Sequence, residues 1–140
     1  MIIGIGIDVV HVHRMQRWHK VPGLLKRYFH QEELSAALER GNSADLSLAA
    51  RFAAKEAFGK ALGTGLAGIV LKDIMVKNRH NGQPEIIVTG TALAALKHSG
   101  AVRIHLSLTH ERDNAIAMVV LENDLAGRPS PPGGSNENEQ

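Results

Sequence analysis

The sequence predicts an α+β fold, in which helices pack on one side of a mainly antiparallel sheet. Antiparallel pairing is indicated at two places: Asn81-Gly82 separates two runs with a period of two, and a polar turn over 111–114 separates two more. The helical part is indicated by an alanine-rich stretch, Arg51 to Gly65, whose apolar residues follow the helical period. We expect one domain over residues 1–126.

The composition fits a single globular core. The chain has 140 residues, of which 44% are hydrophobic, and it has no cysteine, which excludes disulfides and thiolate sites. No apolar run approaches the roughly 18 residues of a membrane-spanning helix, and Met1 to Gly4 lacks the pattern of a signal peptide. We therefore expect a cytoplasmic protein without a membrane partner. Residues 127–140 contain no aliphatic or aromatic side chain, which predicts a disordered tail.

The first element is a strand from Ile2 to Val10 with strict alternation. One face carries Ile3, Ile5 and Ile7, and the other carries Gly4, Gly6 and Asp8. The two glycines leave room for a ligand or another backbone close to Asp8. The alternative is that Asp8 is an ordinary turn or capping residue.

A basic segment follows, since residues 9–31 contain no acidic side chain. Its charges are separated by apolar residues, and Pro22-Gly23 breaks it into two short helical pieces. This pattern favours a docking site for an acidic partner, with a solvated basic face or a nucleic-acid interface as alternatives. The charged residues are Arg14, Arg17, Lys20, Lys26 and Arg27.

The central helix is predicted to begin near Asn42-Ser43 or Ser47, after a short helix over 32–40, and to end at Gly63. The helical period divides it into two faces: Glu56, Gly59, Lys60 and Gly63 lie on one, and Ala54, Phe58, Ala61 and Leu62 on the other. Gly59 costs roughly 1 kcal/mol relative to alanine inside a helix. We therefore expect a close approach at Gly59, by a ligand or by the sheet.

The rest of the chain alternates strands with one helix. Runs over 69–77 and 85–88 flank the Asn81-Gly82 turn, and a helix is expected over 89–98, ending near Gly100. Residues 103–110 alternate, and 115–122 form a nearly continuous apolar run that is typical of a central strand. We expect these last two runs to pair.

The chemistry depends on whether Asp8 and Glu56 meet. Two carboxylates, together with diphosphate oxygens and water, make the oxygen site that magnesium prefers. Lys60 lies one turn from Glu56 and would face the same phosphates. The alternative is an ordinary Glu56–Lys60 ion pair on a helix, worth roughly 0.2–0.5 kcal/mol.

Three motifs resemble the signature blocks of the holo-acyl-carrier-protein synthases, in the same order and at similar spacing. They are Gly4 to Val10, Arg51 to Phe58 with Lys60 to Gly65, and His105 to Glu111. The resemblance spans Met1 to about Glu122. It implies a 4′-phosphopantetheinyl transferase fold and the transfer of the phosphopantetheine arm of coenzyme A to a serine of apo acyl carrier protein. The other product would be adenosine 3′,5′-bisphosphate, and the pathway would be fatty acid biosynthesis.

The resemblance also implies residue roles. Asp8, Glu56 and Lys60 would be catalytic, with Mg²⁺ bound by Asp8 and Glu56. Arg14 and Arg17 would bind the acidic carrier protein, and the chain would form a homotrimer with coenzyme A at its subunit interfaces. No nucleic-acid partner is implied. The coenzyme A site would be formed by Arg51, Lys60, Gly63, Pro84, Thr109 and His110.

The chain departs from the family pattern at several positions near these motifs, and the proton acceptor stays open among Glu32, Glu33 and a metal-bound water. A diphosphate hydrolase that uses the same metal site, and a non-catalytic basic module that binds nucleic acid, are the alternative functions. The departures are His11 for an acidic residue, Gly59 and Thr109 for serine, Gln83 for a basic residue and Asn114 for an aromatic one.

Overall fold

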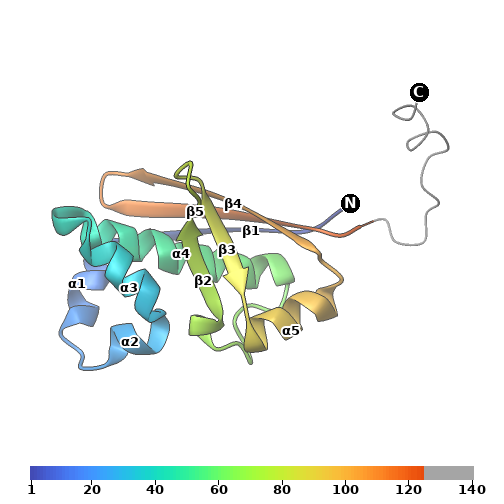
Figure 1. The fold of residues 1–140 in the computed structure, drawn as a ribbon, viewed down its shortest axis with the longest axis horizontal. Coiled ribbons are helices and arrows are strands. Elements are labelled where there is room, and N and C mark those ends of the chain that lie inside the picture. The colour runs from blue at the N-terminus through green and yellow to red at the C-terminus, as the bar shows by residue number, and fades with distance from the viewer. Residues whose placement is uncertain (125–140) are drawn as a thin grey trace.

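The computed structural model describes residues 1–124, and the tail expected over 127–140 lies outside this range. The described residues form two antiparallel sheets and five α-helices (Figure 1). The elements follow in the order β1 (Ile2–His11), α1 (His13–His19), α2 (Leu24–Tyr28), α3 (Gln31–Leu38), α4 (Ala44–Leu62), β2 (Ile74–Asn78), β3 (Pro84–Val88), α5 (Gly90–Ser99), β4 (Arg103–Glu111) and β5 (Asn114–Glu122). Short 3₁₀ turns precede α4 and β2, over Gly41–Ser43 and Leu71–Asp73.

The larger sheet has the strand order β1-β5-β4, with both neighbours antiparallel to β5. The predicted central position of β5 and its pairing with β4 are confirmed. The face of β5 that carries Ala115, Ala117, Val119 and Leu121 is buried. In Figure 1 the sheet lies along the top of the molecule, and α4 runs beneath it.

Glycines on β1 allow α4 to lie unusually close to the sheet. A Cβ atom built on Gly4 would lie 1.9 Å from the carbonyl oxygen of Ala61, and one on Gly6 would lie 2.0 Å from that of Ala57. These distances are far below van der Waals contact, so no larger side chain fits without a backbone shift. The sequence predicted that either a ligand or another backbone approaches this face of β1. At Gly4 and Gly6 the structure shows the backbone of α4.

Helix α4 is buried around most of its circumference, but Glu56, Lys60 and Gly63 on its predicted second face stay at least partly exposed. Among its buried residues are Arg51 and Lys55, which are 5% and 0% exposed. The reason is that α3 and the β2–β3 hairpin cover the side of α4 away from the sheet. At Gly59 the approaching segment is the following loop, because the Gly65 amide donates to the Gly59 carbonyl at 3.0 Å.

The β2–β3 hairpin is a separate two-stranded sheet. Its predicted Asn81-Gly82 turn is present, and Gly82 has a φ of 84°. The strand expected from Ile69 begins only at Ile74. The preceding turn forms instead because the carboxylate of Asp73 accepts hydrogen bonds from the Thr91 amide and hydroxyl, at 2.8 and 2.6 Å, at the start of α5.

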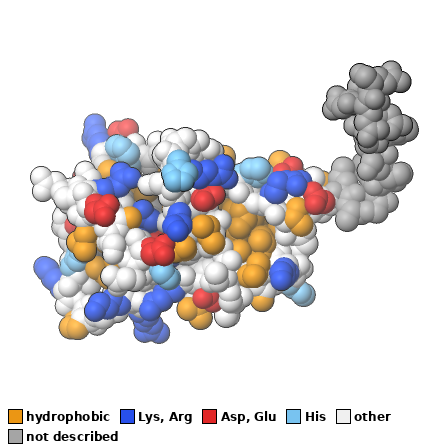
Figure 2. Space-filling view, viewed as in Figure 1, with side chains coloured by type: hydrophobic (Ala, Val, Ile, Leu, Met, Phe, Trp, Pro, Cys, Tyr) orange, Lys and Arg blue, Asp and Glu red, His pale blue; other side chains and the backbone are white. Residues whose placement is uncertain are grey.

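Helices α1 and α2 pack on α4 through aromatic side chains. The ring of Trp18 lies 5.1 Å from that of Tyr28 and 4.7 Å from that of Phe52, both edge to face. Figure 2 shows Lys and Arg side chains gathered in the region of these helices. No helix in the described range 1–124 is long and apolar enough to cross a membrane.

The face of the larger sheet that points away from α4 is apolar and open. On it Ile5, Ile7, Val9 and Met118 are 62%, 57%, 53% and 43% exposed. The strand register places Ile7 opposite Met118 and Val9 opposite Ile116, so these side chains form one continuous surface.

Candidate active site

Asp8 and Lys60 meet between β1 and α4. Alternation along β1 places Asp8 on the same face as Gly4 and Gly6, toward the helix. The ammonium nitrogen of Lys60 lies 3.0 Å from Asp8 Oδ1 and also donates to the Ile7 carbonyl at 2.9 Å. Half of the Lys60 side chain is exposed, so the pair is open to solvent.

Glu56 belongs to the same group of charges. Its pKa is raised, first by burial and then by the negative charge of Asp8, while Lys60 and Arg14 act in the opposite direction. Arg14 extends from α1 with its guanidinium 5.9 Å from the centre of the Phe52 ring. The structure therefore brings together the predicted catalytic residues Asp8, Glu56 and Lys60, with Arg14 at their edge.

The donor set around Asp8 is sparse for a metal site. Within residues 1–124 no group of three or more His, Cys, Asp or Glu side chains is placed to hold a metal ion. Two neighbouring carboxylates that repel each other suit a divalent cation, provided that substrate oxygens and water supply the other ligands. Asp8 and Glu56 thus fit magnesium of the kind that binds together with a phosphate substrate.

A second group of predicted residues lines a pocket of about 340 Å³ on the side of α4 toward β2. Arg51 and His110 lie in its wall together with Arg40. The guanidinium of Arg51 donates to the Val76 carbonyl and to Ser47 Oγ, the latter at 3.3 Å, and burial lowers its pKa. The remaining wall is formed by Ser43, Leu46, Ser47, Ala50, Val76, Asn78 and Leu108.

The other predicted coenzyme A residues are distributed around these two groups. Gly63 ends α4, where its amide donates to the Lys60 carbonyl at 3.0 Å, and Pro84 begins β3. Thr109 pairs with Ile116 on the open face of the sheet, whereas His110, the next residue, lines the pocket. None of Gly63, Pro84 and Thr109 lines that pocket. Arg17 is exposed on α1.

Sequence reasoning missed the buried ion pair between Glu33 and Lys55, whose Oε1 and Nζ atoms lie 2.7 Å apart. Glu33 is one of the candidate proton acceptors, but its carboxylate is enclosed and bonded to Lys55. Glu32, the other candidate side chain, forms an exposed pair with Lys77 at 3.1 Å. The available signal for Lys55 was its setting among Ala53, Ala54, Ala57 and Phe58, which predicts burial on every side.

Comparison with known proteins agrees with this arrangement. A sequence profile of the 4′-phosphopantetheinyl transferase superfamily matches residues 4–119. The chain is 57% identical to the holo-[acyl-carrier-protein] synthase of Treponema denticola over 122 residues, which are 87% of this chain and 99% of that protein. The chain belongs to the holo-[acyl-carrier-protein] synthase family.

Solved structures of holo-[acyl-carrier-protein] synthases share the fold. The enzyme from Neisseria meningitidis is 37% identical, with a TM-score of 0.77 over 88% of this chain and 100% of that one. The enzyme from Bacillus anthracis, in complex with CoA (3′,5′-ADP), is 33% identical, with a TM-score of 0.72 over 89% of this chain and 99% of that one. The predicted family and the predicted α+β class are thereby confirmed.

Proposed function

We propose that the protein transfers the 4′-phosphopantetheine group of coenzyme A to a serine of apo acyl carrier protein, releasing adenosine 3′,5′-bisphosphate. Family membership supports this activity. The activity is assigned to one site because Asp8, Glu56 and Lys60 lie together at an accessible position. These residues belong to two of the three motifs. We also propose a cytoplasmic location and a role in fatty acid biosynthesis.

Asp8 and Glu56 are the residues that would hold magnesium. When bound, magnesium would neutralise the charge of the coenzyme A diphosphate and orient it. The ammonium of Lys60 would stabilise the charge that develops on the diphosphate oxygens while the carrier serine attacks phosphorus and the bond to the adenosine bisphosphate breaks. Its hydrogen bonds to Asp8 and to the Ile7 carbonyl fix the position of this ammonium.

The pocket beside β2 would receive an anionic part of coenzyme A. Arg51 is held by Val76 and Ser47, so its charge is ordered before the substrate arrives. Arg40 adds positive charge to the lining, and His110 adds an imidazole that can form hydrogen bonds. Gly63, Pro84 and Thr109 would complete the binding site from outside this pocket.

A homotrimer is supported by the open apolar face of the larger sheet. Large side chains at Ile5, Ile7, Val9 and Met118 are roughly half exposed, which is unusual for a surface without a partner. If neighbouring subunits cover this face, Thr109 lies at the interface while His110 of the same strand lines the pocket. Coenzyme A would then be bound between subunits, which accounts for the separation of the predicted residues within one chain.

The acidic carrier protein would dock on α1. Arg14 reaches the edge of the carboxylate pair and Arg17 is exposed, so a partner held by both would present its serine close to Lys60. In Figure 2 this part of the surface is rich in Lys and Arg side chains.

The decisive assay incubates the protein with coenzyme A, magnesium and apo acyl carrier protein, and weighs the carrier by mass spectrometry. We expect the carrier to gain the mass of one phosphopantetheine group. Cleavage of coenzyme A with an unmodified carrier would instead identify a diphosphate hydrolase. Salt-sensitive binding to nucleic acid, independent of Asp8 and Glu56, would identify the basic binding module.

A further inference from the structure

Glu33 and Lys55 form an ion pair that the proposed reaction does not use. The side chains of both residues are 0% exposed, and Nζ lies 2.7 Å from Oε1. Burial lowers the pKa of Lys55, while the charge of Glu33 raises it. Two charges in a core bear a desolvation cost that apolar side chains of similar volume avoid, so stability alone does not explain the pair.

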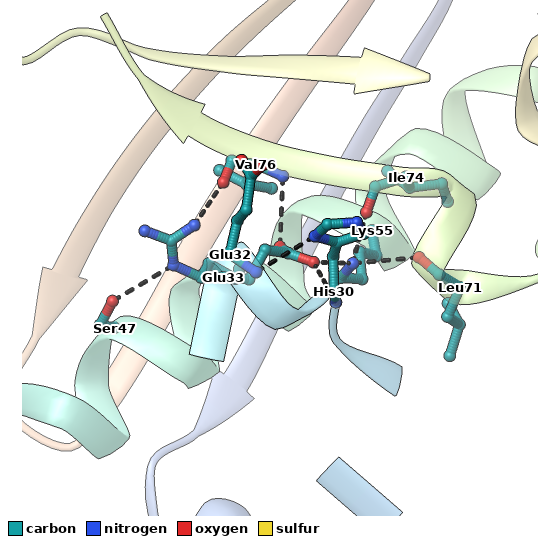
Figure 3. A network of polar contacts seen from close by, with 9 residues as sticks. His30, Glu32, Glu33, Ser47, Lys55, Leu71, Ile74 and Val76 are labelled. Carbon is teal, nitrogen blue, oxygen red and sulfur yellow. Dashed lines mark hydrogen bonds and ion pairs between the residues drawn. The ribbon is translucent and has the colours of Figure 1, made fainter. Parts of the chain in front are cut away.

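Three further hydrogen bonds of the pair are made to one strand and the turn before it (Figure 3). Lys55 donates to the carbonyls of Leu71, at 3.0 Å, and Ile74. The second carboxylate oxygen of Glu33 accepts from the Val76 amide at 3.2 Å. Since the other edge of β2 pairs with β3, these side chains take the place of a neighbouring strand along the free edge of β2.

The same pair also fixes α3 against α4. Glu33 Oε1 accepts from the His30 amide at 3.0 Å, within the capping box that begins α3. The bonds of Glu33 and Lys55 thus join α3, α4 and β2 at one buried point. A shift of β2 along α4 would break several of these bonds together.

The position of β2 matters because this strand forms a wall of the pocket beside Arg51. Val76 and Asn78 line the pocket. Arg51 donates to the carbonyl of Val76, the same residue whose amide donates to Glu33. Figure 3 shows Glu33, Lys55 and Val76 in one connected network that extends to Ser47, a residue of the pocket wall. The depth and orientation of the pocket therefore depend on where Glu33 and Lys55 hold β2.

We propose that Glu33 and Lys55 are positioning residues for coenzyme A: they hold β2 against α4 so that Val76 and Asn78 stay beside Arg51 in the wall of the binding pocket. This inference rests on the proposed function, which assigns coenzyme A to that pocket. The pair acts on binding of coenzyme A and not on docking of the carrier protein, because its bonds within the described residues run to α3, β2 and the turn before β2 rather than to α1.

The test uses the double variant Glu33→Gln/Lys55→Met. It removes both charges at nearly constant volume, so no unpaired charge remains in the core. The introduced glutamine keeps an acceptor for the Val76 amide, but the introduced methionine cannot donate to the Leu71 and Ile74 carbonyls. The matched control is Leu121→Ala, a cavity in β5 at the end of the sheet opposite His110.

Coenzyme A affinity is measured by calorimetry on the whole protein, and the KM for apo carrier protein by steady-state kinetics. We expect the double variant to bind coenzyme A at least about 10-fold more weakly while the carrier KM changes less than about 2-fold. Leu121→Ala should lower the unfolding temperature and leave coenzyme A affinity within about 2-fold of wild type. Glu33→Asp, which keeps the charge but shortens the reach to Val76, should weaken coenzyme A binding in the same direction.

A folded double variant with wild-type coenzyme A affinity would overturn the inference, and so would an equal loss in Leu121→Ala. If the double variant does not fold, Glu33→Asp decides the matter by the same comparison. Measurements on the wild-type protein distinguish failure of the proposed function from failure of this inference. If the wild-type protein binds coenzyme A but does not transfer its arm to the carrier, the proposed function is overturned but this inference is not. Failure of the wild-type protein to bind coenzyme A overturns both.

Discussion

The carboxylate of Glu56 lies in surroundings that disfavour its ionised form. Burial raises its pKa, and the nearby charge of Asp8 raises it further. Lys60 and Arg14 reduce this effect without cancelling it. Functional sites often hold a charge that costs the folded protein stability. The raised pKa of Glu56 is of this kind. By contrast, the pKa of Glu122 is lowered to about 2 by hydrogen bonds from His105 and Arg103.

Glu56→Gln should therefore abolish transfer and also stabilise the fold at neutral pH. A raised folded-state pKa means that the folded protein binds more protons than the unfolded chain between the two pKa values, so stability falls as pH rises through that window. Glutamine does not ionise, so the variant does not lose stability as pH rises through that window. Thermal unfolding without magnesium at pH 7 should show a higher midpoint than wild type, and the difference should vanish at acid pH. The exposed residue Glu39 offers the control, since Glu39→Gln should change neither midpoint nor activity.

Lys60→Ala should slow the reaction more than it weakens carrier docking. Its ammonium is fixed by Asp8 and the Ile7 carbonyl, where it would face charge that develops on the diphosphate. A loss of about 10²-fold in kcat, with little change in the KM for carrier, is expected from removing one such donor. Steady-state kinetics with each substrate varied separately measure both quantities. A change confined to the carrier KM would assign Lys60 to the docking surface.

At Gly4 and Gly6, strand β1 contacts the backbone of helix α4 with no β1 side chain between them. Gly6→Ala would place a methyl group 2.0 Å from the Ala57 carbonyl oxygen, which requires the helix or the strand to move. We expect a loss of at least about 1–3 kcal/mol in the free energy of unfolding, the usual range for overpacking. Urea denaturation followed by circular dichroism measures it. A wild-type midpoint would mean that β1 and α4 adjust more easily than this geometry allows.

Helix α1 should act mainly on encounter with an acidic carrier. Arg14→Glu and Arg17→Glu should raise the KM for carrier protein, and the advantage of wild type should shrink with salt, since the Debye length falls from about 10 Å at 0.1 M to about 3 Å at 1 M. The KM for coenzyme A should hardly change. Kinetics at two salt concentrations test this. Equal losses for both substrates would mean that α1 supports the active site instead, and Arg17→Glu is the cleaner variant because Arg14 also acts on Glu56.

Several elements could be predicted from local patterns, and others could not. The end of α4 at Gly63, with a φ of 81°, and the hairpin at Asn81-Gly82 follow from residue types that favour these conformations. The late start of β2 could not be predicted, because Asp73 is bonded to Thr91, which is 18 positions away. The predicted strand began at Ile69, and this tertiary contact overrides that start.

The whole molecule presents an apolar sheet face that a single chain leaves open. Ile7→Asp would place a charge among Ile5, Val9 and Met118 and should prevent the proposed trimer from forming. We expect light scattering to report a trimer for wild type and a folded monomer for the variant, with transfer lost as the shared site is broken. A wild-type monomer with full activity would show that this face has another role.

The chemistry of the candidate site was predicted, but its separation into a carboxylate group and a pocket beside β2 was not. Motif resemblance named Asp8, Glu56 and Lys60, and the structure brings them together. Strand alternation puts Thr109 and His110 on opposite sides of β4, but the motif could not show that His110 lines the pocket while Thr109 lies on the open face, because the packing of the sheet decides this. Lys55 was hidden for the same reason: its partner Glu33 lies 22 residues away, on another helix.

Gly6 and Asp8 are two residues apart on the same face of β1, yet damage at these positions has different genetic consequences. A side chain at Gly6 meets the backbone of α4, so substitution there should lower the amount of folded protein and leave a second, intact gene copy unaffected. Substitution of Asp8 removes its ion pair with Lys60 but no core contact, so it should leave a folded chain that, in the proposed trimer, still docks carrier protein and joins wild-type subunits. The first kind of allele would be recessive, and the second would interfere with the wild-type product in the same cell.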